Sequence, residues 1–208
     1  MNKETLMPGL VGGLVGFVLA MLIAPAWGGM TGYRGFMMGP TDINGSQTMG
    51  AIDAHFIEQM IPHHEDAILM AELAADNAQH KEIKQLAQDI QRTQSAEIVQ
   101  MKAWYTSWFG KDVPDIFSGF SSGMGSHMTH MGMMGDATDI GSLATAADFD
   151  KAFIEQMIPH HQMAVMMAQM LSGTTNRPEM KQLAENIIDA QTREINSMRE
   201  WYRQWYGR

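Results

Sequence analysis

The nine-residue sequence FIEQMIPHH occurs twice in this chain, at Phe56–His64 and again at Phe153–His161, a shift of 97 residues. The agreement continues at the same shift without gaps, and KQLA, for example, occurs at 84–87 and again at 181–184. Agreement of this length within one chain indicates a tandem repeat. The two copies are therefore expected to fold alike.

Each copy has the pattern of two helices. Apolar residues in its second half recur at steps of three and four, as at Ile83, Ala87 and Ile90, which is typical of a helix that packs along one face. Aspartate is a good N-cap, and proline is favourable in a first helical turn. The predicted helices span residues 53–77, 81–109, 148–172 (or from 150) and 178–206. Two helical hairpins predict an all-α, antiparallel four-helix bundle with one shared core.

A proline precedes the histidine pair in each copy, at Pro62 and Pro159. Inside a helix, proline removes one backbone hydrogen bond and crowds the preceding turn, at a cost of about 3 kcal/mol. The alternative is that the helix begins at the proline. Because the residues before it already form a capped helical start, we expect a helix that continues through the proline and is kinked beside the histidines.

The rest of the chain divides around these hairpins. Residues 1–27 are expected to be a hydrophobic helix that is either a signal peptide or a membrane anchor, since 6–26 carries no charge and ends in the cleavage-like Ala24-Pro25-Ala26. Either role leaves the remainder outside the cytoplasm, in the periplasm or an equivalent compartment. After this leader we expect an irregular Gly/Met-rich segment 28–50, hairpin 51–110, an irregular Met/His-rich linker 111–147 and hairpin 148–208.

Composition narrows the chemistry of such a bundle. The chain has 22 methionines, 8 histidines and no cysteine in 208 residues, with a formal net charge of −9. An acidic chain without clustered cations is a poor partner for nucleic acid. The lack of cysteine excludes disulfides, thiolate zinc sites and iron–sulfur clusters. Thioether and imidazole remain as donors, and together they favour Cu(I), with Ag(I) as a similarly soft surrogate.

The repeated motif brings these donors together. On a helix, Met60 shares a face with His63 or His64, because residues three and four positions apart are neighbours. Adjacent histidines point about 100° apart, so one of each pair is expected to face the site and the other to face elsewhere. The candidate ligands in the two hairpins are Met60, His63, His64, Met70, Met157, His160, His161, Met163 and Met167.

The linker holds a second set of candidates. Its sequence MGSHMTHMGMMG is polar and rich in glycine, so its methionines have no core to pack into. Ligation is the better explanation of these residues. They are His127, Met128, His130, Met131, Met133 and Met134.

Polar side chains interrupt the apolar face of the second helix in each copy. Gln94 and Glu97, with Gln191 and Glu194, are predicted to hydrogen-bond to the histidine rings and so orient them. A solvated helix edge is the alternative. The repeated aromatic residues near 104–108 and 201–205 are expected to pack the bundle ends rather than to hold a cation.

The chain resembles the family called domain of unknown function 305, through MIPHHEDAILMAELA and MIPHHQMAVMMAQML. The resemblance covers about 53–109 and 150–206. It implies a ferritin-like four-helix bundle and an exported protein. Tandem members with Met-rich flanks, which this chain resembles, imply Cu(I) and Ag(I) binding and copper resistance rather than catalysis.

We therefore expect an extracytoplasmic, non-enzymatic Cu(I)-binding protein that acts in copper buffering, transfer or resistance. A copper exporter or sensor is the expected protein partner, and the membrane is a further partner if residues 6–26 are retained. One alternative is a metal-dependent oxidoreductase on the same bundle, although di-iron bundles use Glu-x-x-His pairs and none occurs here. The other is a structural or interaction module without metal, in which methionine only fills the core.

Overall fold

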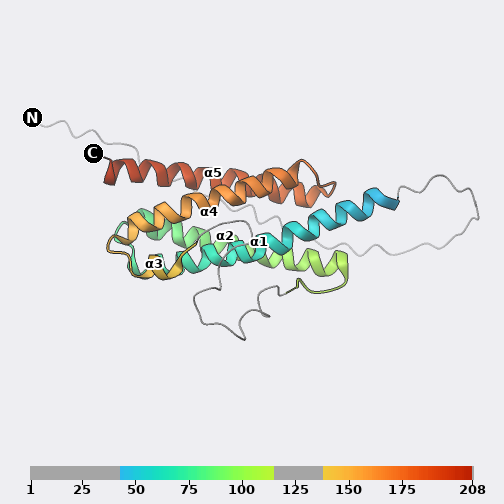
Figure 1. The fold of residues 1–208 in the computed structure, drawn as a ribbon, viewed down its shortest axis with the longest axis horizontal. Helices are drawn as coiled ribbons and strands as arrows, with labels where there is room; N and C mark the ends of the chain where they lie inside the picture. Colours follow the sequence, from blue (N-terminus) through green and yellow to red (C-terminus); the bar gives the residue numbers. More distant parts are fainter. Residues whose placement is uncertain (1–42, 115–137, 208) are drawn as a thin grey trace, which may run out of the picture. The chain divides into compact units, whose positions relative to one another are not determined.

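The computed structural model describes residues 43–114 and 138–207, with side chains from residue 50 onward. Within these ranges the chain forms helices and no strand (Figure 1). The helices are α1 (Ile43–Asn77), α2 (Lys81–Phe109), α3 (Ile140–Ala144), α4 (Phe149–Ser172) and α5 (Pro178–Tyr206). The described residues 43–114 and 138–207 belong to one compact unit. The predicted all-α fold is confirmed.

Local sequence signals set most helix ends. Asp148 is the N-cap of α4, where its side chain accepts a hydrogen bond from the Lys151 backbone N–H. Pro178 opens α5, whose first turn has no need of the missing N–H. After α2, Gly110 adopts a left-handed conformation with φ of 67°, which glycine tolerates without strain, and its N–H donates to the Thr106 carbonyl at 2.9 Å.

Two expectations outside the repeats were wrong. Residues 43–50, predicted as irregular, form the first turns of α1, which begins ten residues before Asp53. Because extending a formed helix costs little, packing further along α1 carries it through a segment that has no apolar periodicity. The linker contains α3, whose N-cap Asp139 accepts from the Ser142 N–H at 2.9 Å. Residues 1–27 and most of the linker lie outside the described residues.

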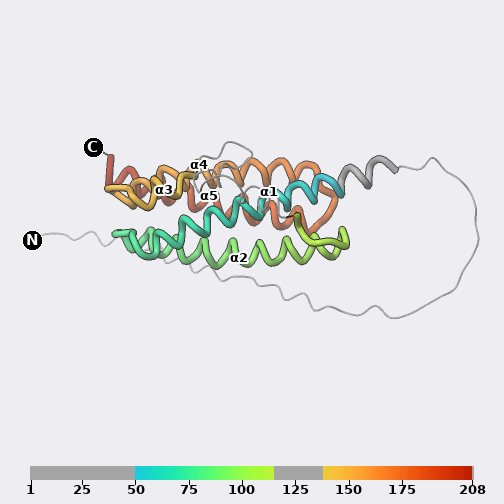
Figure 2. Tube along the Cα trace, turned by 60° about the horizontal axis from the view of Figure 1, so that its bottom comes forward, coloured from blue at the N-terminus to red at the C-terminus, as the bar shows by residue number. Residues whose placement is uncertain are grey.

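The four long helices pair as two hairpins, α1 with α2 and α4 with α5 (Figures 1 and 2). Between the hairpins, α1 and α4 make the principal contact. Both helices continue through their prolines, so Pro62 and Pro159 lie inside a helix rather than at its start. No helix in the described ranges is long and apolar enough to cross a membrane, and the segment 6–26 is not among them.

Two apolar clusters fill the bundle where one core was expected. The first joins the C-terminal half of α1 to the N-terminal halves of α2 and α4 and includes Met70, Met157 and Met198. The second joins the opposite halves and includes Met60, Met101 and Met180. Both hairpins contribute to each cluster, so neither hairpin has a core of its own. Along α1 and along α4, the histidine pair falls between the two clusters.

Candidate metal centre

Four histidines form a layer between the two apolar clusters. The rings of His63 in α1 and His160 in α4 face each other, with centroids 3.7 Å apart and planes tilted by 38°. Each also neighbours the next ring along its own helix, at 6.4 Å for His63–His64 and 6.1 Å for His160–His161. As the helical turn predicts, the two rings of a pair have different partners: one meets a histidine of the other hairpin, while the second contacts a glutamate of its own hairpin.

Burial keeps the two facing rings neutral. The pKa of His63 is lowered from 6.5 to about 3, because burial disfavours the charged ring and because His64 and His161 lie nearby. The pKa of His160 is lowered well below 6.5, first by burial and then by the other three histidines of the layer. Near neutral pH each ring therefore keeps a nitrogen lone pair, which is the form that binds a metal.

The outer histidines are held by carboxylates from the second helix of their own hairpin. Nε2 of His64 lies 2.7 Å from Oε2 of Glu97, and Nε2 of His161 lies 2.6 Å from Oε2 of Glu194. Both imidazoles are fully buried, while the carboxylates reach the surface with about a fifth of their area exposed, at 20% and 17%. The predicted hydrogen bonds between these glutamates and the histidine rings are present.

The predicted glutamine contacts are different. Gln94 and Gln191 are buried, as expected of residues on the packing face. Within the part of the chain that the structure describes, however, Oε1 of each glutamine has no hydrogen-bond partner. Their proposed role in orienting the rings stays a prediction.

The candidate methionines separate by burial. Met60, Met70 and Met157 are fully buried, Met167 packs against the cluster that contains Met60, and Met163 is half-buried and belongs to neither cluster. Two neighbouring methionines of α4 are exposed, Met166 at 42% and Met170 at 63%. The linker candidates, namely His127, Met128, His130, Met131, Met133 and Met134, lie outside the described residues.

Sequence reasoning did not include Met101 and Met198 among the candidate ligands. They occupy equivalent positions in the two copies and are fully buried, one in each apolar cluster, with Met60 and Met157 respectively. Their place on the periodic face of the second helix made them look like core residues only. Methionine recurs at this register on both hairpins, and both residues pack in the core as their place on the apolar face predicts.

These donors fit a soft ion better than a hard one. Within residues 43–114 and 138–207, no three His, Asp or Glu side chains are grouped so that they could hold a metal ion. A metal at the histidine layer would thus need thioether sulfur to complete its coordination. Imidazole with thioether suits Cu(I), whereas calcium and magnesium prefer several oxygen ligands.

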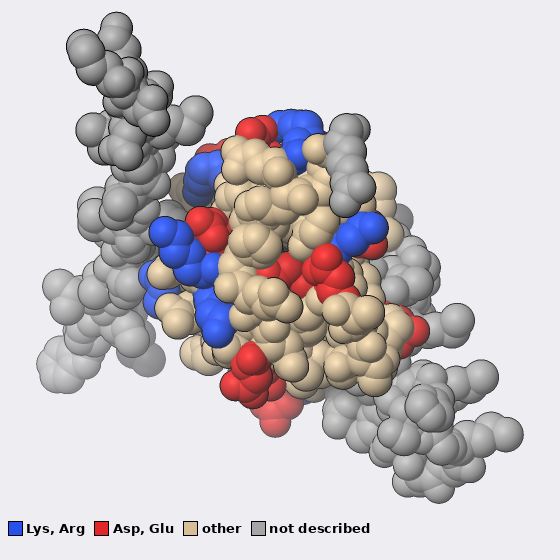
Figure 3. All heavy atoms as spheres, turned by 90° about the vertical axis from the view of Figure 1, so that its left-hand side faces the viewer, with Lys and Arg blue, Asp and Glu red and all other residues tan. Residues whose placement is uncertain are grey.

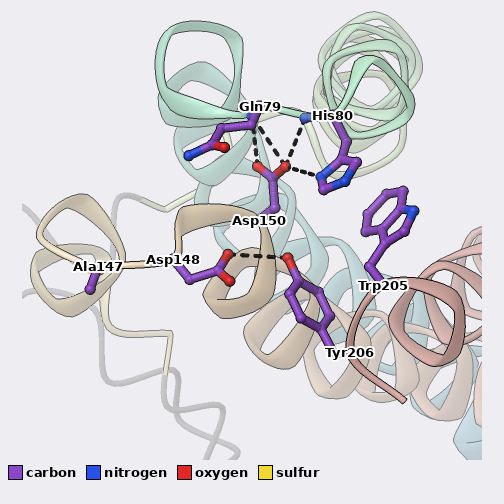
Figure 4. Close-up of a pocket in the computed structure, with 7 residues that line it drawn as sticks. All are labelled: Gln79, His80, Ala147, Asp148, Asp150, Trp205 and Tyr206. Carbon is purple, nitrogen blue, oxygen red and sulfur yellow. Dashed lines mark hydrogen bonds and ion pairs between the residues drawn. The ribbon is translucent and has the colours of Figure 1, made fainter. Parts of the chain in front are cut away.

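A shallow pocket of about 440 Å³ lies at one end of the bundle (Figure 4). Buried Asp150 accepts hydrogen bonds there from the backbone N–H groups of Gln79 and His80, and its Oδ2 lies 2.5 Å from Nδ1 of His80. The His80 ring stacks on Trp205 with centroids 3.7 Å apart. Acidic and basic side chains lie interspersed over this end face (Figure 3).

The repeat places a related arrangement elsewhere in the bundle. Arg177, the counterpart of His80, donates from Nε to buried Asp53 at 3.1 Å and lies over the ring of Trp108, 4.0 Å from its centroid. The expectation that these aromatic residues only pack the bundle ends was thus incomplete, since the guanidinium of Arg177 also lies over the Trp108 ring. In both places an aspartate of one hairpin holds the start of the second helix of the other.

Comparison with known proteins places these features in a family. The family profile described as "Domain of unknown function (DUF305)" matches residues 53–202. The chain belongs to the DUF305 family. The resemblance noted from the MIPHH motifs is thereby confirmed, and the family profile spans both hairpins and the linker between them.

Several proteins of known structure share this fold. CopM is 50% identical in its Cu(I)-bound form, with a TM-score of 0.63 over 74% of this chain and 98% of that chain. Its Cu(II)-bound form is 51% identical, with a TM-score of 0.66 over 74% and 97% of the two chains. CopM has also been solved with silver bound. A DUF305 fragment from Deinococcus radiodurans is 27% identical over 72% and 93% of the chains, with a TM-score of 0.57.

One curated relative matches a shorter segment. It is uncharacterized protein L153 of Acanthamoeba polyphaga mimivirus, which is 47% identical over 49 residues. The match covers 24% of this chain and 32% of that protein, so the chain spans about a third of the relative's length.

Proposed function

We propose that this protein binds Cu(I) through imidazole and thioether groups, with Ag(I) as a surrogate, and acts in copper buffering, transfer or resistance. The observation that carries the proposal is the duplicated His–Glu pair, buried in the middle of each hairpin with a buried methionine one turn before it. CopM, about half identical to this chain, has been solved with Cu(I), Cu(II) and silver. Its likeness supports the same metal class here.

The residues of the layer have separate tasks in this proposal. Neutral His63 and His160 offer lone pairs without competition from protons near pH 7. Buried Met60 and Met157 supply sulfur, which selects a soft ion over zinc or magnesium. Burial also limits access of water and oxidants to the ion, which favours storage or handover over redox turnover.

We place this activity outside the cytoplasm, with a copper exporter or sensor as the protein partner. The uncharged segment 6–26 and the lack of cysteine support that compartment. Intact-mass measurement of protein isolated from native cells tests it: loss of about 26 residues indicates a cleaved signal peptide, and the full mass indicates a retained leader.

Competition for copper tests the central claim. Full-length protein is titrated with Cu(I) in the presence of a chromogenic cuprous chelator, and we expect it to withdraw copper from the chelator. The double variant M60L M157L, which keeps side-chain volume, should lower the affinity by on the order of tenfold, and M180L, a buried methionine outside the candidate set, should not. Failure of the wild-type protein to withdraw copper would overturn the proposal.

The same preparation tests the catalytic alternative. A cuprous oxidase would consume oxygen continuously when loaded with copper and given a reductant. We expect no consumption above that of free copper. Sustained turnover, lost in M60L M157L, would instead assign an oxidoreductase activity to the layer.

A further inference from the structure

The pocket that contains His80 and the related arrangement around Arg177 differ at equivalent positions of the repeat. Each includes a buried aspartate and a tryptophan. Other positions change, and at the shift of 97 residues the exchanged pairs are His80 and Arg177, Asp148 and Ala51, and Tyr206 and Phe109. The first residue of each pair lines the pocket. What these exchanges have in common indicates what the pocket can hold.

The arrangement around Arg177 shows that an aspartate and a tryptophan hold a guanidinium group in this fold. Cζ of Arg177 lies 4.0 Å from the centroid of the Trp108 ring, and its Nε donates to Asp53 at 3.1 Å. A guanidinium is planar and more weakly hydrated than an ammonium group, so it can lie over an aromatic ring while its edge donates to a carboxylate. One copy of the repeat thus supplies this cation from its own chain.

In the pocket, the exchanges remove a cation and add polar oxygen atoms. His80 stands where the other copy has arginine and does not carry the permanent charge of a guanidinium. Asp148 and Tyr206 stand where the other copy has alanine and phenylalanine, which have no polar side-chain atom. The pocket therefore has one more acidic side chain and one fewer fixed positive charge than its counterpart.

Asp148 keeps an oxygen for a ligand. Its side chain is exposed, and within the described part of the chain both of its hydrogen bonds end on Oδ1, from the Lys151 N–H and from the Tyr206 hydroxyl. Oδ2 is thus left to accept from another molecule. Figure 4 shows the rings of His80, Trp205 and Tyr206 on one side of the pocket and its two aspartates on the other.

The titration of Tyr206 indicates a negative electrostatic potential in the pocket. The pKa of its hydroxyl is raised, first by burial, then by the hydrogen bond to Asp148 and by the charges of Asp148 and Asp150. Surroundings that disfavour a further negative charge favour a positive one. The pocket therefore resembles the Arg177 arrangement in its aromatic and acidic groups, without an arginine of its own.

We propose that this pocket binds a guanidinium group supplied by another molecule, either a small organic cation or an arginine side chain of a partner protein. The Asp148 carboxylate accepts from its N–H groups, and the aromatic side chains of the pocket contact its planar faces. This site lies at the end of the bundle, apart from the histidine layer, and does not depend on the proposed copper function.

NMR of full-length, ¹⁵N-labelled protein titrated with butylguanidinium tests the inference. The indole N–H signals of Trp205 and Trp108, identified by their loss in W205F and W108F, report on the two arrangements separately. We expect the Trp205 signal to shift, with a dissociation constant on the order of 1 mM for so small a ligand. The Trp108 signal should stay, because Arg177 already lies over that ring. No shift at Trp205, or equal shifts at both rings, would overturn the inference.

Substitutions test the residues that distinguish the pocket from its counterpart. D148N keeps an N-cap oxygen for α4 but removes the charge, and should weaken binding by about fivefold. H80R gives the pocket a guanidinium of its own and should abolish the Trp205 response. The matched control is E72Q, which removes an exposed charge elsewhere and should bind as wild type. Circular dichroism verifies that each variant is folded. Wild-type affinity in folded D148N or H80R would overturn the assignment.

Two further titrations define the ligand. Butylammonium has the same charge without the planar group and should bind several-fold more weakly. Equal binding of butylammonium would overturn the assignment to guanidinium. A blocked glycine peptide with one central arginine distinguishes the sources: tighter binding than butylguanidinium supports an arginine side chain of a partner, and equal or weaker binding supports a small organic cation.

Discussion

Two equivalent joints of the bundle are built from different residues. At one, buried Asp150 holds His80, which stacks on Trp205, and at the other, buried Asp53 holds Arg177, which lies over Trp108. Both join the first helix of one hairpin to the start of the second helix of the other. Both joints have an aspartate and an aromatic ring, while the residue between them differs, histidine at one joint and arginine at the other.

The joints also differ in how completely the aspartate is satisfied. Asp150 accepts from two backbone N–H groups as well as the His80 ring, so it fixes the residues just before α2 from the opposite hairpin. Asp53 is hydrogen-bonded to Arg177 through Oδ2, while its buried Oδ1 has no partner among the described residues. Asp150 should therefore contribute more to stability, although Arg177 carries the more permanent charge.

The largest expected effect comes from removing these aspartates. D150A removes three hydrogen-bond contacts, to the backbone N–H groups of Gln79 and His80 and to the His80 ring, and should lower the free energy of unfolding by about 3 kcal/mol. D53A removes a single contact, to the partly exposed Arg177 side chain, and should cost about 1 to 2 kcal/mol. Urea denaturation measures both. Equal losses would contradict the ranking.

Lowering the pH should destabilise the folded protein through its histidine layer. The folded-state pKa of His63 is about 3 against 6.5 unfolded, so below pH 6.5 the unfolded chain binds a proton that the folded chain does not. Above pH 6.5 His63 has little effect on the free energy of unfolding. Below pH 6.5 that free energy decreases with decreasing pH, by about 1 to 2 kcal/mol at pH 5. Thermal or urea unfolding at pH 7.5 and 5 measures it. H63Q should flatten this slope, and an unchanged slope would place the titrating group elsewhere.

Exchanging the diverged residues should have the smallest effect. R177H converts one joint to the chemistry of the other and should cost about 1 kcal/mol, through loss of the cation over Trp108 and of the Asp53 contact. H80R, the reverse exchange, should cost less than D150A because the backbone bonds to Asp150 remain. Melting temperatures of both variants test this order. A loss of stability in R177H as large as in D150A would show that the contacts of Arg177 stabilise the bundle as much as the hydrogen bonds of Asp150.

The sequence was sufficient for the helices because their signals are local. Caps at Asp148 and Pro178 and the apolar repeat set the helix ends, and the repeat predicted that the two hairpins would fold alike. The 43–50 extension of α1 was missed because Gly45 and Gly50 break the pattern that identifies a helix. Its cause is packing further along the chain, which no local signal reports.

The sequence identified the residues of the candidate site but not which residues of the two hairpins contact each other. The MIPHH motif singled out the histidines, and helical spacing separated the two rings of each pair. The contact between His63 and His160, however, depends on how α1 packs against α4. These residues are far apart in sequence, so no local pattern predicts it. Met101 and Met198 were assigned to packing, and the structure buries both of them in the apolar clusters.

The contact of His63 with His160 has an evolutionary consequence. It joins equivalent residues of the two copies, as does an isologous contact on the axis of a twofold homodimer. In a homodimer of single hairpins, every substitution would appear at both joints at once. In one chain the two halves can change separately, and the His80 joint and the Arg177 joint are a place where they differ.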